Sequence, residues 1–137
     1  MLFAACLSEL TSAWFPHTTN DGLKRIIELL EKGSPLLVHG CFTRAMPQGC
    51  LASHIAWHHP QTESLQHDAG IRWLTRVAKL NPATSEVVRA WDVSGINDWP
   101  LRSALLEACK AEQDRRENVR PTHDRKTASL TPVTCNS

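Results

Sequence analysis

The chain has 137 residues, of which 42% are hydrophobic and 21% are charged, and its formal net charge at pH 7 is +1. This length supports one domain. The composition is that of a folded globular protein rather than of a disordered chain. Because the charges nearly balance, no field of the whole molecule attracts the chain to nucleic acid or to an anionic membrane.

The cysteines indicate a reducing compartment. Their number is odd and their spacing is uneven, which is not typical of a disulfide framework. The first ten residues lack the basic region of a signal peptide, and no apolar run approaches the roughly 20 residues of a membrane span. We therefore expect a cytoplasmic protein with no membrane association. The five cysteines are Cys6, Cys41, Cys50, Cys109 and Cys135.

Helical periodicity begins at the N-terminus. Apolar residues recur every three or four positions over 2–14 and again over 22–32, which predicts two amphipathic helices. Thr19 lies where it can cap the second helix, and Gly33 lies where that helix should end. The short apolar run 36–42 has no obvious strand partner, so we expect a loop or an isolated extended segment.

The second half of the chain predicts further helices. Residues 50–59 favour a short helix, and 63–80 favour the longest one, with Thr62 as its cap. A shorter helix is predicted over 82–91. A final helix should begin near 98–100, because an Asp followed by a Pro in the first turn is typical of a helix start.

These elements predict an all-α fold. We expect a compact bundle of five or six short helices in one domain, residues 1–117. The segment 118–137 is polar, contains two prolines and has no period that could bury a face, so we predict a disordered C-terminal tail.

A cluster of histidines and cysteines suggests a metal site. If 50–59 is helical, Cys50, His54 and His58 lie at i, i+4 and i+8 on one face, where neighbouring pairs can share an ion. The three together span about 12 Å, so Cys41, His39 or a residue of another helix would have to complete a zinc site. The alternative, which we favour, is that Cys50 and His54 pack in the core, with the His54 ring bonded to a backbone carbonyl.

Catalysis has little support in the sequence. A nucleophilic Cys41 or Cys50 would need a base and an orienting carboxylate, and no such arrangement is recognisable. The chain contains no Gly-rich phosphate loop, H-E-x-x-H, G-x-S-x-G or C-x-x-C motif. Residues 76–91 have the outline of a helix-turn-helix carrying Arg89, but an ordinary connection between two bundle helices explains them better. We therefore do not expect nucleic-acid binding.

The chain has five tryptophans and no tyrosine. Trp73 lies on an apolar stripe and is predicted to be core, whereas Trp57, Trp91 and Trp99 lie near helix ends or off the stripes. Tryptophan is enriched at interface hot spots, so we predict that these three contact a partner, although all five could also fill the core. The sequence thus favours a small non-catalytic helical protein that binds another protein or forms a homodimer. The first alternative is a metal-binding or metal-sensing helical domain, and the second is a helix-turn-helix regulator that binds nucleic acid.

Overall fold

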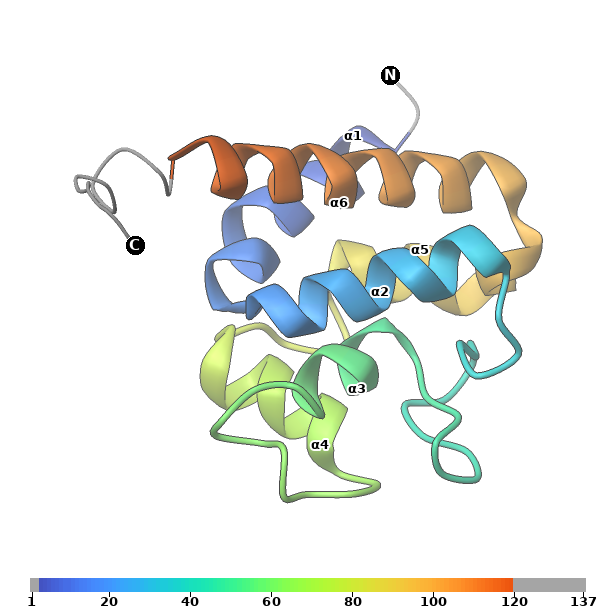
Figure 1. Ribbon diagram of the computed structural model, residues 1–137. Coiled ribbons are helices and arrows are strands. Elements are labelled where there is room, and N and C mark those ends of the chain that lie inside the picture. The colour runs from blue at the N-terminus through green and yellow to red at the C-terminus, as the bar shows by residue number, and fades with distance from the viewer. Residues whose placement is uncertain (1–2, 120–137) are drawn as a thin grey trace.

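The computed structural model describes residues 3–119, and the regular elements in this range are helices (Figure 1). Short π-helical turns extend α1 and α4 over Leu10–Trp14 and Trp73–Val77. The prediction of a compact all-α bundle is therefore confirmed. The predicted tail lies outside the described residues except for 118–119, which continue the last helix. The α-helices are α1 (Ala4–Glu9), α2 (Asn20–Lys32), α3 (Leu51–Ala56), α4 (Ala69–Arg72), α5 (Glu86–Ser94) and α6 (Trp99–Val119).

The helices enclose one hydrophobic core. In Figure 1, α6 runs across the molecule with α1 beside it and α2 beneath it, and α3 and α4 lie on the other side of α2. Trp14 and Trp73 meet in the core with their ring centroids 5.2 Å apart in an edge-to-face arrangement. Both indoles are buried, so the prediction that Trp73 is a core residue is confirmed.

Helix α2 forms as its sequence predicts. The Thr19 hydroxyl accepts a hydrogen bond from the Gly22 N–H at 3.1 Å, which caps the helix. Gly33 follows the last helical residue with a φ of 61°, the left-handed conformation that ends helices and that glycine adopts without strain. The buried side of α2 faces the core and carries Leu23, Ile26, Ile27, Leu29 and Leu30.

Helix α3 lies at the centre, and all six of its residues are buried. Its polar side chains therefore need partners inside the protein. The His54 Nε2 lies 2.7 Å from the carbonyl oxygen of Leu36, and the Ser53 hydroxyl donates to the carbonyl of Phe42 at 2.6 Å. These contacts fix the segment 36–42. Within the described residues its one isolated bridge joins Leu37 to Gly49, and a second bridge just beyond it joins Thr43 to the same Gly49. The segment therefore agrees with the predicted loop or isolated extended segment.

The prediction that 63–80 forms the longest helix is wrong. Helix α4 begins only at Ala69, and α6, with 21 residues, is the longest helix described. Thr62 does not cap a helix, because its buried hydroxyl donates at 2.7 Å to the carbonyl of the last residue of α3. Gly70 lies so close to α3 that a Cβ there would come within 2.6 Å of the Ser53 hydroxyl. Tertiary contacts with α3 thus override the helical periodicity of this segment.

Helix α5 begins at Glu86 rather than at 82. The Ser85 hydroxyl caps it by accepting from the Val88 N–H at 3.2 Å. The Glu9 carboxylate also reaches this helix end from α1 and accepts from the backbone N–H groups of Glu86 at 2.8 Å and Val87 at 3.3 Å. Helix α5 therefore begins where α1 supplies a negative charge to its N-terminus.

Helix α6 begins as predicted, with Asp98 accepting from the Leu101 N–H at 3.1 Å and Pro100 in the first turn. Its Arg102 crosses to the end of α2 and donates to the carbonyls of Leu30 at 2.6 Å and Glu31 at 2.9 Å. These carbonyls belong to the last turn of α2, where no backbone N–H group of the same helix is available to donate to them. Within the described part of the chain, no helix has the length and apolarity needed to cross a membrane.

Replacing Arg102 with alanine should lower the free energy of unfolding by about 1–2 kcal/mol, because two charge-assisted hydrogen bonds at a helix C-terminus are lost. Urea denaturation measures the loss. Arg102→Lys is the matched control: it keeps the charge but not the planar fork that reaches two carbonyls, so it should recover only part of the loss. A lysine variant as stable as the wild type would show that the fork geometry is not what stabilises this end.

Candidate functional site

Four of the five tryptophans are held inside the fold by their indole N–H groups. Trp57 donates to the Gln66 carbonyl at 3.1 Å and is half-buried, while Trp91 donates to the Val38 carbonyl at 2.8 Å and is only 1% exposed. Trp14 and Trp73 likewise donate within the fold, to Glu9 and His17. Of the three tryptophans predicted to contact a partner, Trp91 is therefore a core residue and Trp57 anchors a loop.

Trp99 differs from the others because it is 64% exposed. It stands at the first position of α6, where the Arg102 guanidinium lies 5.1 Å from its ring centroid, a cation–π contact. Trp99 is thus the one predicted partner-binding residue whose ring is open to solvent.

The predicted zinc ligands have other partners. His54 is 2% exposed and bonded to Leu36, the His58 Nδ1 lies 3.0 Å from the His54 carbonyl, and the Cys50 sulfur lies 3.9 Å from the Ser53 hydroxyl. Cys41 and Cys50 line the same small cavity of about 10 Å³. Across residues 3–119, no group of three or more His, Cys, Asp or Glu side chains is placed to hold a metal ion. Zinc binding stays a prediction that this geometry does not favour.

The protonation of these groups agrees with packing in the core rather than with a nucleophilic cysteine. Burial raises the pKa of the Cys50 thiol to about 11, so the thiolate that a nucleophilic cysteine requires is scarce at neutral pH. Burial lowers the pKa of His54 to about 4, so its ring is neutral. A neutral ring facing a carbonyl must donate from Nε2, which is the backbone-bonded arrangement that we favour from the sequence.

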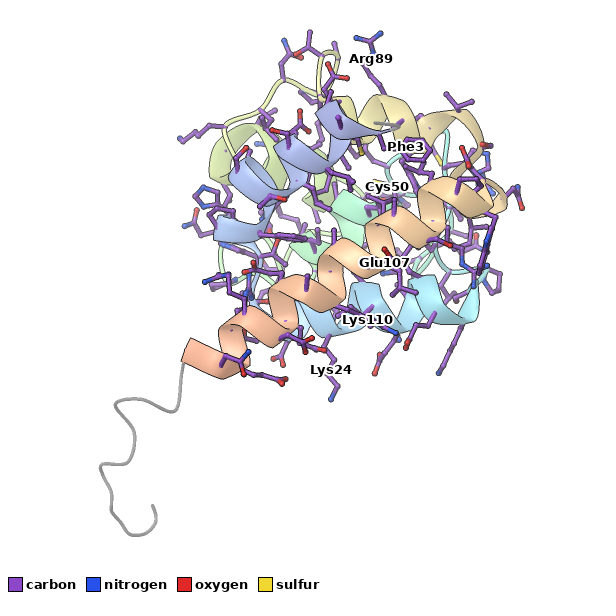
Figure 2. The ribbon with its side chains drawn as sticks, turned by 90° about the horizontal axis from the view of Figure 1, so that it is seen from above. Phe3, Lys24, Cys50, Arg89, Glu107 and Lys110 are labelled. Atoms are coloured by element: carbon purple, nitrogen blue, oxygen red, sulfur yellow. The ribbon has the colours of Figure 1, made fainter. Side chains whose placement is uncertain are left out.

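An open groove lies between α1 and α5. Its volume is about 560 Å³. Figure 2 shows two of its residues, Phe3 and Arg89, on the side of the molecule that α1 and α5 form, away from Lys24 and Lys110. We call this groove and its rim the α1–α5 face. It is lined by Phe3, Ala4, Ala5, Cys6, Glu86, Arg89, Ala90 and Val93.

Helix α5 contributes a second stripe to this face. Val87 and Trp91 form its buried stripe. Glu86, Arg89, Ala90 and Val93 are spaced by three and four residues, which places them together on another side of the helix. Val93 is 80% exposed, the most exposed large apolar side chain of the described residues.

The other side of the groove is built from α1 and its N-cap residue Phe3, and Phe3 is the one large side chain there. Ala4 and Ala5 come from the first turn of α1, and an alanine side chain ends at Cβ, so little fills the space between the two helices. Cys6 is buried beneath them, and its pKa is raised to about 11, first by burial and then by the neighbouring carboxylates of Glu9 and Glu86. The groove therefore presents an apolar, unreactive surface.

Two opposite charges stand on the same face. Glu86 and Arg89 are both exposed, and neither belongs to any of the four ion pairs of residues 3–119. Arg89, the arginine of the helix-turn-helix alternative, thus stands beside an acidic residue on a mixed surface, whereas phosphate binding favours a basic surface. The helix-turn-helix hypothesis therefore stays a prediction, and the surface around Arg89 does not have the basic character that would support it.

The sequence alone does not reveal this face. A signal was present, because Val93 is apolar but lies off the stripe that Val87 and Trp91 form. What the sequence could not show is that α1 would lie beside that second stripe and leave a groove. Comparisons of the chain with protein-family models, with curated proteins and with solved structures find no significant match.

Proposed function

We propose that this protein acts without catalysis, in the cytoplasm, by binding another protein chain through the α1–α5 face. The observation that carries the proposal is the second stripe of α5, which ends in the exposed Val93 beside an open groove. A helix in a monomeric bundle needs only one stripe to pack. An apolar groove with polar groups at its rim is typical of a protein-interaction site.

The surroundings of the face support the same proposal. Apart from Phe3, its apolar residues are small or short, so a partner can approach the backbone of α1 and α5 closely at Ala4, Ala5 and Ala90. Glu86 and Arg89, which form no ion pair within residues 3–119, can fix the orientation of a partner without making the face strongly polar. The described cysteines Cys6, Cys41, Cys50 and Cys109 carry no disulfide, which is compatible with the reducing compartment that we propose.

Photo-crosslinking in the cells that express the protein tests this proposal. With a benzophenone amino acid in place of Val93, we expect one discrete crosslinked product that disappears when Arg89→Glu is added. The same probe in place of Ile71, an exposed residue of α4, is the matched control and should give no such product. Absence of a product from position 93, or equal products from both positions, would contradict the proposal. The mass of the product also shows whether the partner is a second copy or another protein.

A further inference from the structure

We infer that the partner of the α1–α5 face is a second copy of the same chain, bound around a two-fold axis. This inference rests on the proposed function and names its partner. In a two-fold dimer both copies use the same patch, so the patch must complement itself. The face meets this condition in both shape and charge.

The complementarity of shape comes from a projection beside a hollow. Val93 projects into solvent, being 80% exposed, and it borders a groove lined by the small side chains of Ala4, Ala5 and Ala90. A two-fold axis repeats this pair, so that Val93 of each copy can enter the groove of the other. Both exposed apolar surfaces are then removed from water, which favours association.

The complementarity of charge comes from Glu86 and Arg89. They stand three residues apart on the same side of α5 and have no ion-pair partner among the described residues. Two copies that pack α5 against α5 in opposite directions can place Glu86 of each copy near Arg89 of the other. The formal net charge of +1 per chain adds almost no long-range repulsion between copies.

A different protein partner would have to match both the acidic Glu86 and the basic Arg89 of the face. An acidic peptide would leave Glu86 facing a like charge, and a basic peptide would do the same at Arg89. A purely apolar helix would bury both charges without partners, which is costly. A second copy supplies the opposite charge for each residue, and for this reason we infer it.

Charge exchange tests the inference, with native mass spectrometry and sedimentation of the full chain as the measurements. The wild type should be dimeric at concentrations on the order of 100 µM. Glu86→Arg gives two basic residues on the face and Arg89→Glu gives two acidic ones, so each single variant should dimerise at least tenfold more weakly. Circular dichroism should show both variants folded.

Recombining the charges provides the decisive control. A mixture of Glu86→Arg and Arg89→Glu chains should form mixed dimers, and a chain that carries both changes should again dimerise with itself. Loss of folding could not produce this recovery. A monomeric wild type, single variants that dimerise like the wild type, or a mixture that stays monomeric would each overturn the inference. A monomeric wild type whose position 93 still crosslinks another protein would leave the proposed function intact.

Discussion

Replacing Glu9 with alanine is expected to lower the free energy of unfolding by about 3 kcal/mol, because one carboxylate supports several buried groups at once. It accepts from the Trp14 indole at 2.9 Å and from the Ser85 hydroxyl at 2.5 Å. It also accepts from the first two backbone N–H groups of α5. Alanine removes the negative charge from this helix end and leaves the Trp14 indole N–H and the Ser85 O–H without an acceptor.

Equilibrium urea unfolding at pH 7 measures this loss, and Glu9→Gln is the matched control. Glutamine keeps one acceptor oxygen but not the charge, so its loss should lie between that of alanine and zero. A control on the same helix is Ser8→Ala, because Ser8 is exposed and its replacement should change stability by less than about 0.5 kcal/mol. An alanine variant of Glu9 as stable as that of Ser8 would show that the carboxylate does not hold α1 to α5.

The same carboxylate should make the protein sensitive to acid. Burial raises the pKa of Glu9, but the hydrogen bonds from Ser85, Glu86, Trp14 and Val87 outweigh it and hold the pKa below its ordinary value of 4.5. A depressed carboxyl pKa stabilises the fold above pH 4.5, and that stabilisation is lost as the pH falls through the folded-state value. In Glu9→Gln, unfolding below pH 4.5 should therefore depend less steeply on pH than in the wild type.

Stability should also fall between pH 6.5 and pH 4, by about 3 kcal/mol, because of His54. Burial lowers the pKa of this ring from 6.5 to about 4, more than its hydrogen bond to the Leu36 carbonyl raises it. Between these values the unfolded chain binds a proton that the folded chain excludes, so unfolding becomes more favourable as the pH falls. This pH window lies mostly above the one in which Glu9 titrates, so the effects of the two residues on stability can be measured separately.

Urea unfolding at several pH values between 7.5 and 4 tests this expectation, with His54→Gln beside the wild type. Glutamine can still donate to Leu36 but does not titrate, so its stability should change much less over this range. The pKa of His59 is also lowered, first by burial, and its contribution remains in both proteins. If the two proteins lost stability in parallel, the buried His54 would not be the cause.

Local signals in the sequence predicted much of the fold. The cap at Thr19, the stop at Gly33 and the start at Asp98 and Pro100 each act within a few residues, and the structure has them as expected. The core position of Trp73 follows equally from its local stripe. These features depend on the chain near them, so reading the sequence is enough to find them.

The features that the sequence did not predict depend on contacts between distant segments of the chain. Glu9 supports a helix 76 residues further along the chain, and no local pattern points to that contact. Trp91 lies near a helix end, yet its indole reaches the Val38 carbonyl and the ring is buried. The α1–α5 face exists only because two helices that lie far apart in the sequence, Ala4–Glu9 and Glu86–Ser94, meet in the fold, so it could be found only in the folded protein.

The most direct test of the interaction surface is a methyl NMR spectrum of the wild type recorded over a dilution series. The methyl groups of Val93, Ala90 and Ala4 should change their chemical shifts together as the chains dissociate. The methyl groups of Ile71, exposed on another helix, should not. Shifts that follow concentration at Ile71 but not at Val93, or no change at any of these methyls up to concentrations on the order of 100 µM, would contradict self-association through the α1–α5 face.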